Sequence, residues 1–264
     1  MDLRNIAMIV SYDGTSYYGF QSQPAGNTIQ DELQIALRRL THESIKVEGS
    51  GRTDAGVHAN GQVISFRTAS PIPIQKWTLA INSWLPNDIV VRSAHEMPDD
   101  FHARFSAIRK TYRYSLTTGK YPNVFTTRYR HHHYNRLNVE AMRAALPDLL
   151  GEHDFTSFTS GASTKSSHIR AIFEARLEEE AGDLHLYLTG SGFLYNMVRI
   201  IMGTLLRIGE GKWPPDCIPS IIEAKHRQAA GPRAVAQGLM LWEVGYPEPH
   251  ASALRHDPAN APGE

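Results

Sequence analysis

The sequence predicts an α+β fold in which the element order β-α-β-β-α-β occurs twice. Three observations support this prediction: apolar runs of strand length, apolar residues at helical spacing between them, and turn-forming residues at their boundaries. Two such units side by side can form one broad antiparallel sheet with helices behind it. We therefore expect two tandem ferredoxin-like units, an element order that RNA-recognition (RRM) domains also use.

The first unit begins with a continuous apolar run at Ile6–Val10, which indicates a buried strand. Thr28 with Asp31 three residues later resembles a capping box, and apolar residues follow at helical spacing as far as Leu40. The remaining elements expected here are strands at 45–50, 62–66 and 89–93 and a helix at 74–84.

The second unit repeats this order after a boundary near residues 103–107. Its expected elements are strands at 111–117, 169–179, 184–189 and 239–244, helices at 137–150 and 193–208, and an extra helix at about 215–226. We therefore expect an N-terminal RRM-like domain at 1–104, a C-terminal RRM-like domain at 105–246 and a mobile, proline-rich tail at 247–264.

The composition excludes several classes of protein. Hydrophobic residues make up 41% of the chain and charged residues 20%, which is typical of a chain that folds around a core. Cys217 is the single cysteine, so an intrachain disulfide and a cysteine-based metal cluster are both excluded and a reducing compartment is favoured. Because no stretch of ~18 apolar residues and no signal-peptide pattern occur, we expect a cytoplasmic protein without membrane segments.

The charges are unevenly distributed although they sum to zero, with 27 basic and 27 acidic residues. The segment 101–139 has no acidic residue and a local charge of +8, whereas 174–183 carries five acids against Arg176. Such a basic segment can attract the phosphates of a nucleic acid, and a solvated basic face without a partner is the alternative. Its basic residues are Arg104, Arg109, Lys110, Arg113, Lys120, Arg128, Arg130 and Arg136.

The segment 51–59, GRTDAGVHA, is the most informative loop of the chain. It lies between two predicted strands, and its two glycines permit a tight backbone that presents Arg52, Thr53 and Asp54 at the end of a sheet. A cation two residues from a carboxylate indicates an anion site beside a nucleophile or base. The alternative is a turn in which the carboxylate accepts a backbone N–H.

Further blocks of sequence share a pattern with one known family. They are Tyr12–Gln21, Thr28–Gln30, Asn82–Ile89, Phe101–Ala107, Thr111–Tyr114, Asp154–Phe158, Gly192–Arg199 and Gly238–Leu241. Together with GRTDAGVH, and in this order from about residue 6 to 246, they resemble the tRNA pseudouridine synthase A family. The segments 117–136 and 160–167 do not match it closely, so RNA contacts there are left open.

This resemblance implies a pseudouridine synthase fold with a central RNA-binding cleft. It also implies an isomerase that converts uridine to pseudouridine at positions 38, 39 and 40 of the tRNA anticodon stem-loop, acting as a homodimer without a cofactor. By motif position, Asp54 is expected to be the catalytic residue and Tyr112 to stack on the target base. Arg52 is expected to assist base flipping, and Arg199 to pair with the catalytic carboxylate.

The chemistry of these residues agrees with that reaction. The N1–C1′ bond of uridine breaks, the uracil turns and C5 joins C1′, so no second substrate is needed and one carboxylate can act as nucleophile or base. A glycoside hydrolase usually needs two carboxylates, and the loop offers only Asp54. Flipping a base costs a few kcal/mol, and stacking contributes about 1–3 kcal/mol, a task suited to Tyr112.

Other candidate residues have structural interpretations. We expect Tyr114 to pack in the core, His58 to make a structural hydrogen bond and Asp13 to form a turn. The histidines at 131–133 alternate in direction along a strand, so they cannot share a metal ion and are expected on a basic RNA face.

Two alternative functions stay open at this stage. One is a catalytically silent RNA-binding protein, although the chain has no RNP1-type run of aromatic residues. The other is a hydrolase of free nucleosides, which would not need the basic segment 101–139.

Overall fold

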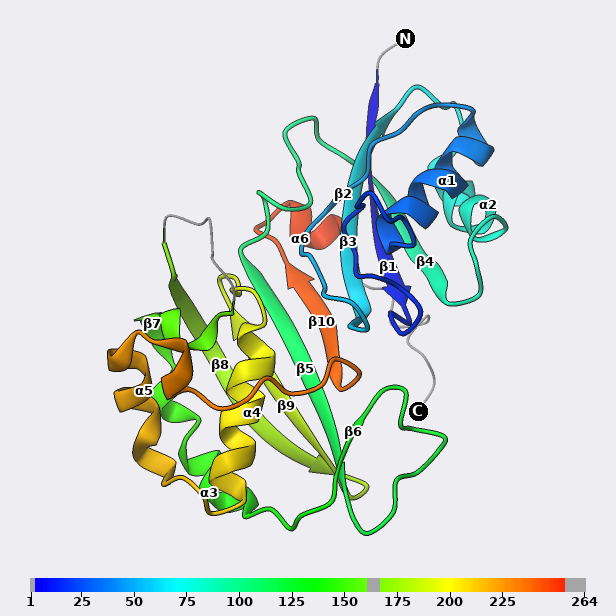
Figure 1. Ribbon diagram of the computed structural model, residues 1–264. Coiled ribbons are helices and arrows are strands. Elements are labelled where there is room, and N and C mark those ends of the chain that lie inside the picture. Colours follow the sequence, from blue (N-terminus) through cyan, green and yellow to red (C-terminus); the bar gives the residue numbers. More distant parts are fainter. Residues whose placement is uncertain (1–2, 161–166, 255–264) are drawn as a thin grey trace. The chain divides into compact units, whose positions relative to one another are not determined.

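The computed structural model describes residues 3–160 and 167–254 and divides the chain into two compact units (Figure 1). Of the described residues, the first unit contains 3–108 and 241–254, and the second contains 109–160 and 167–240. The domain boundaries at 104/105 and 246/247 stay a prediction, and the units differ from it because the chain after residue 240 joins the first unit.

The first unit has the predicted order of two βαβ halves, and its elements are β1 (Arg4–Tyr12), α1 (Ile29–Thr41), β2 (Glu48–Gly49), β3 (His58–Thr68), α2 (Trp77–Asn82) and β4 (Ile89–Met97). The strands are ordered β4-β1-β3, with both pairs antiparallel and the short β2 also antiparallel to β3. The last strand, β10 (Leu239–Gly245), follows β3 in this order. Helices α1 and α2 lie next to each other (Figure 1).

Local sequence signals account for most of these boundaries. The hydroxyl of Thr28 accepts the Asp31 N–H at 3.2 Å and donates to the Asp31 carboxylate at 2.6 Å, which confirms the predicted cap of α1. The helix expected at 74–84 is shorter: a 3₁₀ turn at Ile74–Lys76 precedes α2, which ends at Asn82. The helix therefore ends before Pro86, which disfavours helical backbone at the residue that precedes it.

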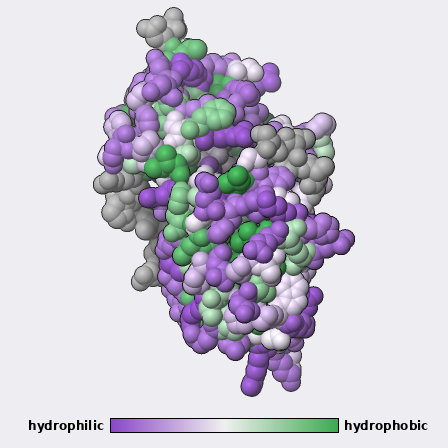
Figure 2. All heavy atoms as spheres, turned by 90° about the vertical axis from the view of Figure 1, so that its left-hand side faces the viewer, coloured by the Kyte–Doolittle hydropathy of each residue, from purple (hydrophilic) through white to green (hydrophobic). Residues whose placement is uncertain are grey.

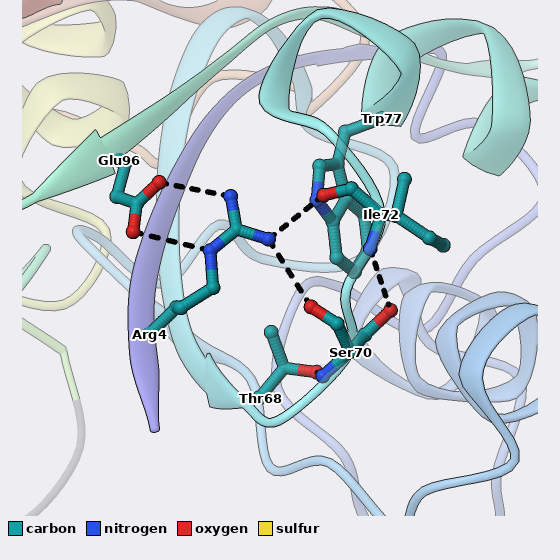
Figure 3. A network of polar contacts seen from close by, with 6 residues as sticks. All are labelled: Arg4, Thr68, Ser70, Ile72, Trp77 and Glu96. Carbon is teal, nitrogen blue, oxygen red and sulfur yellow. Dashed lines mark hydrogen bonds and ion pairs between the residues drawn. The ribbon is translucent and has the colours of Figure 1, made fainter. Parts of the chain in front are cut away.

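Arg4 ties the connection between β3 and α2 to the edge of the sheet (Figure 3). Its guanidinium donates to both oxygens of Glu96, at 3.1 and 2.8 Å, and to the carbonyls of Ser70 and Ile72, at 3.1 and 2.7 Å. The indole of Trp77 donates to the same Ile72 carbonyl at 3.1 Å. One side chain of β1 therefore orients the segment that leads into α2.

The second unit follows the predicted repeat except for its last strand, β10, most of which belongs to the first unit. Its elements are β5 (Arg109–Thr118), β6 (His131–His133), α3 (Val139–Ala144), β7 (Gly151–Asp154), β8 (Ile169–Glu180), β9 (Asp183–Gly190), α4 (Met197–Gly209) and α5 (Ile218–Ala224). The strands are ordered β5-β9-β8-β7 with antiparallel pairing, whereas the short β6 pairs with β5 in parallel. The three helices lie together on one face of this sheet (Figure 1). Strand β6 coincides with the histidines that were expected along a strand, whereas β7 was not expected from the sequence.

In the second unit, individual residues determine one hairpin turn and the ends of two helices. Ala181 and Gly182, with φ of 50° and 86°, form the two-residue turn of the predicted β8–β9 hairpin. The helix expected at 137–150 stops at Ala144, and Pro147 starts a separate 3₁₀ turn because it has no N–H to donate. Helix α4 begins at Met197 rather than at residue 193, because Asn196 has a left-handed φ of 60°.

Helix α4 forms the centre of the second unit, and all of its residues except Arg207 are buried. A helix that is buried all round packs closely against its neighbours. A Cβ at Gly203 would lie 1.6 Å from the Pro232 carbonyl oxygen, and one at Gly231 would lie 2.7 Å from the backbone of Thr204. Glycine at both positions thus allows the segment 231–234 to lie directly on α4.

The segment expected to form a mobile tail, which begins at residue 247, contains the short helix α6 (His250–Ala253). The His250 ring meets the Phe101 ring edge-on at 5.2 Å, and the Tyr246 hydroxyl donates to the Ala103 carbonyl at 2.6 Å. Residues 246–254 therefore pack on the first unit, and the rest of the expected tail, 255–264, lies outside the described residues.

One face of the molecule is mostly hydrophilic, and its hydrophobic residues form small separate groups (Figure 2). Crossing a membrane takes a long and continuously apolar helix, and none of the helices in the described part of the chain is one.

Candidate active site

The side chain of Gln62 holds the start of the loop that carries Arg52 and Asp54. Gln62 lies in β3 and is fully buried. Its amide nitrogen donates to the Gly51 carbonyl at 2.6 Å, and its amide oxygen accepts the Gly51 N–H at 3.2 Å. One side chain thereby satisfies both backbone groups of Gly51 and ties the loop to the strand that follows it.

A second anchor holds the loop at Thr53. The hydroxyls of Thr53 and Tyr12 are 2.7 Å apart, and both residues are buried. Burial raises the pKa of Tyr12 to about 12, so its phenol stays protonated at neutral pH. The Gln62 amide nitrogen lies 3.5 Å from the same phenol oxygen, which joins the two anchors into one buried network.

The chain from Tyr17 to Phe20 lies directly against the loop. The Phe20 N–H donates to the Thr53 carbonyl at 3.0 Å, and the Gly56 N–H donates to the Tyr17 carbonyl at 3.4 Å. Gly19 has a φ of +97°, and a Cβ there would lie 2.6 Å from the Thr53 carbonyl oxygen. Only glycine fits that close approach, which explains its place in the Tyr12–Gln21 block.

These anchors orient the three central side chains differently. Arg52 is exposed and Asp54 is half-buried, whereas Thr53 points into the buried network. The Asp54 carbonyl accepts the Val57 N–H at 3.1 Å, which closes the turn before β3. The loop therefore presents Arg52 and Asp54 on a rigid backbone, and the expectation that it also presents Thr53 is wrong.

Asp13 and His58 have the structural roles that the sequence predicts. The Asp13 carboxylate accepts the Thr15 N–H at 3.0 Å and its hydroxyl at 2.5 Å, which forms the turn. His58 is buried, and its Nδ1 lies 3.0 Å from the Gly14 nitrogen and 3.1 Å from an Asp13 oxygen. Because a backbone N–H can only donate, Nδ1 is the acceptor of the Gly14 N–H and does not carry a proton towards Asp13.

Tyr112 and Tyr114 share one face of β5 but have different surroundings. The Tyr112 ring is largely buried and meets the Phe193 ring edge-on at 5.1 Å, so Phe193 fixes its orientation. Tyr114 is fully buried and donates its hydroxyl proton to the Val235 carbonyl at 3.0 Å. Tyr114 therefore packs in the core, as expected, and the stacking role of Tyr112 stays a prediction.

Arg199 lies in the first turn of α4 and is buried. Its Nε donates to the Ala234 carbonyl at 2.8 Å, and the Ala234 N–H donates to the Arg199 backbone carbonyl at 3.0 Å. The next carbonyl, that of Val235, accepts the Tyr114 hydroxyl proton. Its Nη1 donates to the side chain of Asn196 at 3.0 Å. The guanidinium is thus held in one orientation by the start of its own helix and by the segment after α5.

The four predicted site residues fall into two pairs by unit. Arg52 and Asp54 share a loop of the first unit, and Tyr112 and Arg199 belong to the second unit. The predicted pairing of Arg199 with Asp54 joins the two units and stays a prediction. Sequence reasoning overlooked the supporting roles of Gln62 and Tyr12, for which the residue types alone carry no signal.

The three histidines of β6 lie next to different groups. His131 Nδ1 lies 3.1 Å from the Tyr114 hydroxyl, His132 Nε2 lies 2.8 Å from the Gly119 carbonyl, and His133 Nε2 lies 3.3 Å from a Glu210 oxygen. Within the described residues no group of three or more His, Cys, Asp and Glu side chains could hold a metal ion. Burial lowers the pKa of His131 to about 4 and also lowers that of His133. These two rings are neutral at pH 7 and add no charge to the basic segment. The expected place of the three histidines on an RNA face stays a prediction.

Comparison with known proteins identifies relatives over nearly the whole chain. Residues 8–106 and 145–247 match a family model described as tRNA pseudouridine synthase. A tRNA pseudouridine synthase A from Bacillus subtilis is 51% identical over 90% of this chain and 97% of its own. The enzyme of the same name from Brevibacillus brevis is 46% identical over 92% of this chain and 100% of its own. The enzyme of the same name from Geobacillus kaustophilus is 47% identical over 92% of this chain and 95% of its own.

A comparison with solved structures finds distant similarity. An archaeal box H/ACA Nop10–Cbf5 complex aligns with 89% of this chain and 59% of its own, at 10% identity and a TM-score of 0.33. This similarity is too low to transfer any property to the chain.

Proposed function

The chain belongs to the tRNA pseudouridine synthase family, and from that premise we propose that it modifies uridines 38, 39 and 40 in the anticodon stem-loop. As a member of this family it is an isomerase that converts uridine to pseudouridine, with tRNA as its substrate. Asp54 is the residue that we assign to the chemical step.

The observation that carries this assignment is the construction of the 51–57 loop. A half-buried carboxylate stands two residues from an exposed guanidinium, on a backbone held by Gln62 and Tyr12. Rigid placement of a reacting group lowers the entropy lost on reaching the transition state. A single carboxylate suffices for this reaction, because the uracil that leaves C1′ returns to it through C5 and no second molecule takes part.

Three further residues support the reaction in this proposal. Tyr112 stacks on the flipped uracil, in an orientation that the edge-on contact with Phe193 maintains. Arg52, which is exposed, enters the space that the flipped base leaves. Arg199 pairs with Asp54 and keeps the carboxylate ionised by lowering its pKa, as a neighbouring guanidinium does.

The proposal includes the assembly and the location of the enzyme. We infer a homodimer, as the family resemblance implies, that acts in the cytoplasm, where its tRNA substrate is found. The reaction as proposed uses side chains alone and takes no cofactor.

The direct test is tritium release from an unmodified tRNA transcript labelled as 5-³H-uridine, because the C5 hydrogen is lost when C5 joins C1′. Mass measurement of the intact tRNA does not detect the reaction, since pseudouridine and uridine have equal mass. We expect release by the unmodified enzyme and none above background by Asp54→Asn, with the Kd for tRNA changed by less than about threefold.

Asp99→Asn is the matched control, because Asp99 is an exposed carboxylate of the same unit whose side chain pairs with Arg67 at the surface. It should release tritium at the unmodified rate. Full release by Asp54→Asn would contradict the role of Asp54. Tight tRNA binding without any release by the unmodified protein would instead support the silent RNA-binding alternative.

A further inference from the structure

The loop 119–130, between β5 and β6, gathers exposed apolar side chains in a short stretch. In Figure 1 it is the long green excursion beside β6. Tyr121 and Val124 are each 75% exposed and Phe125 is 88% exposed. The loop lies outside the two segments that match the family model, 8–106 and 145–247. Exposed apolar groups of this kind typically mark a binding surface.

Hydrogen bonds within the loop hold its backbone in place. The Asn123 side-chain oxygen accepts the Phe125 N–H at 3.0 Å. The Asn123 backbone carbonyl accepts the N–H groups of Thr126 and Thr127 at 3.0 and 3.1 Å. The end of the loop is attached to the sheet by an ion pair between Arg130 and Asp183. The loop is therefore an ordered turn that keeps Val124 and Phe125 at the surface.

The charges around these side chains favour RNA as the partner. Lys120, Arg128 and Arg130 flank the aromatic residues, and no acidic residue occurs between residues 101 and 139. The Lys120 ammonium lies 5.3 Å from the centre of the Tyr121 ring. Alternating cations and aromatic rings match the phosphates and the base faces of an unpaired strand. In a two-fold contact between two copies, this basic segment would face itself, with no acidic residue of the segment to offset the repulsion.

The position of the loop separates it from the target base. Tyr112, which we assign to that base, lies six residues before Thr118, the last residue of β5. At about 3.3 Å per residue, the loop begins about 20 Å further along the strand. Any nucleotide that the loop contacts is therefore distinct from the uridine that Tyr112 holds.

We propose that the loop 119–130 is a second RNA-contact surface of the enzyme. Tyr121 and Phe125 stack on unpaired bases of the tRNA other than the target uridine, and Lys120 and Arg128 contact the adjacent phosphates. This inference rests on the proposed function, because it takes tRNA as the bound molecule.

The test compares the Kd of two double variants for an unmodified tRNA transcript and for a blunt RNA duplex at several salt concentrations. Tyr121→Ala with Phe125→Ala removes the rings, and Lys120→Gln with Arg128→Gln removes the charges. We expect the first variant to bind the transcript about tenfold more weakly, with an unchanged dependence of the binding constant on salt. It should bind the duplex as the unmodified enzyme does, because the bases of a duplex are not exposed for stacking. The second variant should lower the salt slope for both RNAs by about 2.

Phe173→Ala is the matched control, because Phe173 is a 56% exposed aromatic residue of β8 that precedes Glu174. It should bind both RNAs as the unmodified enzyme does. At saturating tRNA the first double variant should release tritium at the unmodified rate, with a KM raised about tenfold.

An unchanged Kd for the ring variant would overturn the proposal. So would a loss of self-association, measured by sedimentation without RNA, because the loop would then serve a contact between two copies. Absence of tritium release by the unmodified protein would contradict the proposed function, while the comparison of Kd values would still report on the loop.

Discussion

At the residue scale, the candidate site depends on side chains that do not reach the substrate themselves. Gln62 satisfies both backbone groups of Gly51, and Tyr12 holds the hydroxyl of Thr53, the neighbour of Asp54. All of these contacts are buried or nearly so, where an unsatisfied polar group costs about 1–3 kcal/mol. The position of the Asp54 carboxylate is thus set by hydrogen bonds to the residue before it and to the start of the loop.

We predict that Gln62→Leu lowers the rate of tritium release at saturating tRNA about 10- to 100-fold, because the loop loses its anchor and Asp54 its position. The Kd for tRNA should change by less than about threefold, since Gln62 is buried. The free energy of unfolding should fall by about 1–3 kcal/mol, measured by urea denaturation.

Gln34→Leu is the control for Gln62, because Gln34 also accepts a backbone N–H, that of Val47 at 3.1 Å, outside the 51–57 loop. It should lower stability to a similar degree and leave the rate of release unchanged. Equal losses of rate in both variants would show that general destabilisation, and not the position of Asp54, limits the reaction.

At the element scale, the short parallel pairing of β6 with β5 places a half-buried histidine against the core residue Tyr114. Tyr114 donates its single hydroxyl proton to the Val235 carbonyl, so the contact with His131 requires the N–H of His131 Nδ1 as donor. Burial is the main cause that lowers the pKa of His131 to about 4, and the neighbouring His133 and His132 add to it. The neutral ring is therefore the form that the folded state prefers.

This preference predicts a pH dependence of stability. The pKa of His131 is lower in the folded state, about 4, than the ordinary value of 6.5, so the unfolded chain binds the proton more readily. The contribution of His131 to stability is complete above pH 6.5 and is lost progressively as the pH falls towards 4.

His131→Gln, which keeps hydrogen-bonding capacity but does not titrate, should flatten the pH dependence of the free energy of unfolding between these two values. Urea denaturation at pH 7, 6 and 5 is the measurement. Parallel curves for the two proteins would show that His131 does not contribute to the pH dependence.

At the scale of the whole molecule, the net charge of zero conceals a separation of charge along the chain. The segment 101–139 has a local charge of +8, and five acids occur in 174–183. One of those acids, Asp183, pairs with Arg130, so part of the basic segment is already neutralised within the fold. Other cations of the segment, among them Lys120 and Arg128, are exposed at the surface.

We therefore predict that the affinity for tRNA falls steeply with salt even though the protein is neutral overall. Reversing Lys110 and Arg128 to glutamate should weaken binding at low salt and reduce the slope of log K against log salt by about 2. Arg130 is left unchanged because its reversal would also break the pair with Asp183.

Reversing Arg38 and Arg39, exposed at the end of α1, changes the net charge by the same amount outside the basic segment. Both Kd and slope should then stay near those of the unmodified protein. Equal effects of the two charge reversals would assign the salt dependence to net charge alone.

Features encoded by neighbouring residues could be predicted from the sequence. The cap of α1 at Thr28, the hairpin turn at Ala181 and Gly182, and the repeated element order all follow from signals within a few residues. The same holds for the 51–57 loop, whose glycines and charged residues lie together in the chain. The roles of Asp54 and its three partner residues come from the family resemblance and stay predictions.

Other features depend on contacts between distant segments, and only the tertiary structure shows them. Gln62 bonds to Gly51 because β2 and β3 are adjacent. His131 is neutral because β6 pairs with β5, where its neighbour Leu116 lies fifteen residues earlier in the chain. Helix α4 starts at Met197 because Asn196 adopts a left-handed backbone and bonds Ser160 and Arg199. Local patterns select the elements, whereas burial and hydrogen-bond partners far along the chain determine where those elements end and which side chains are charged.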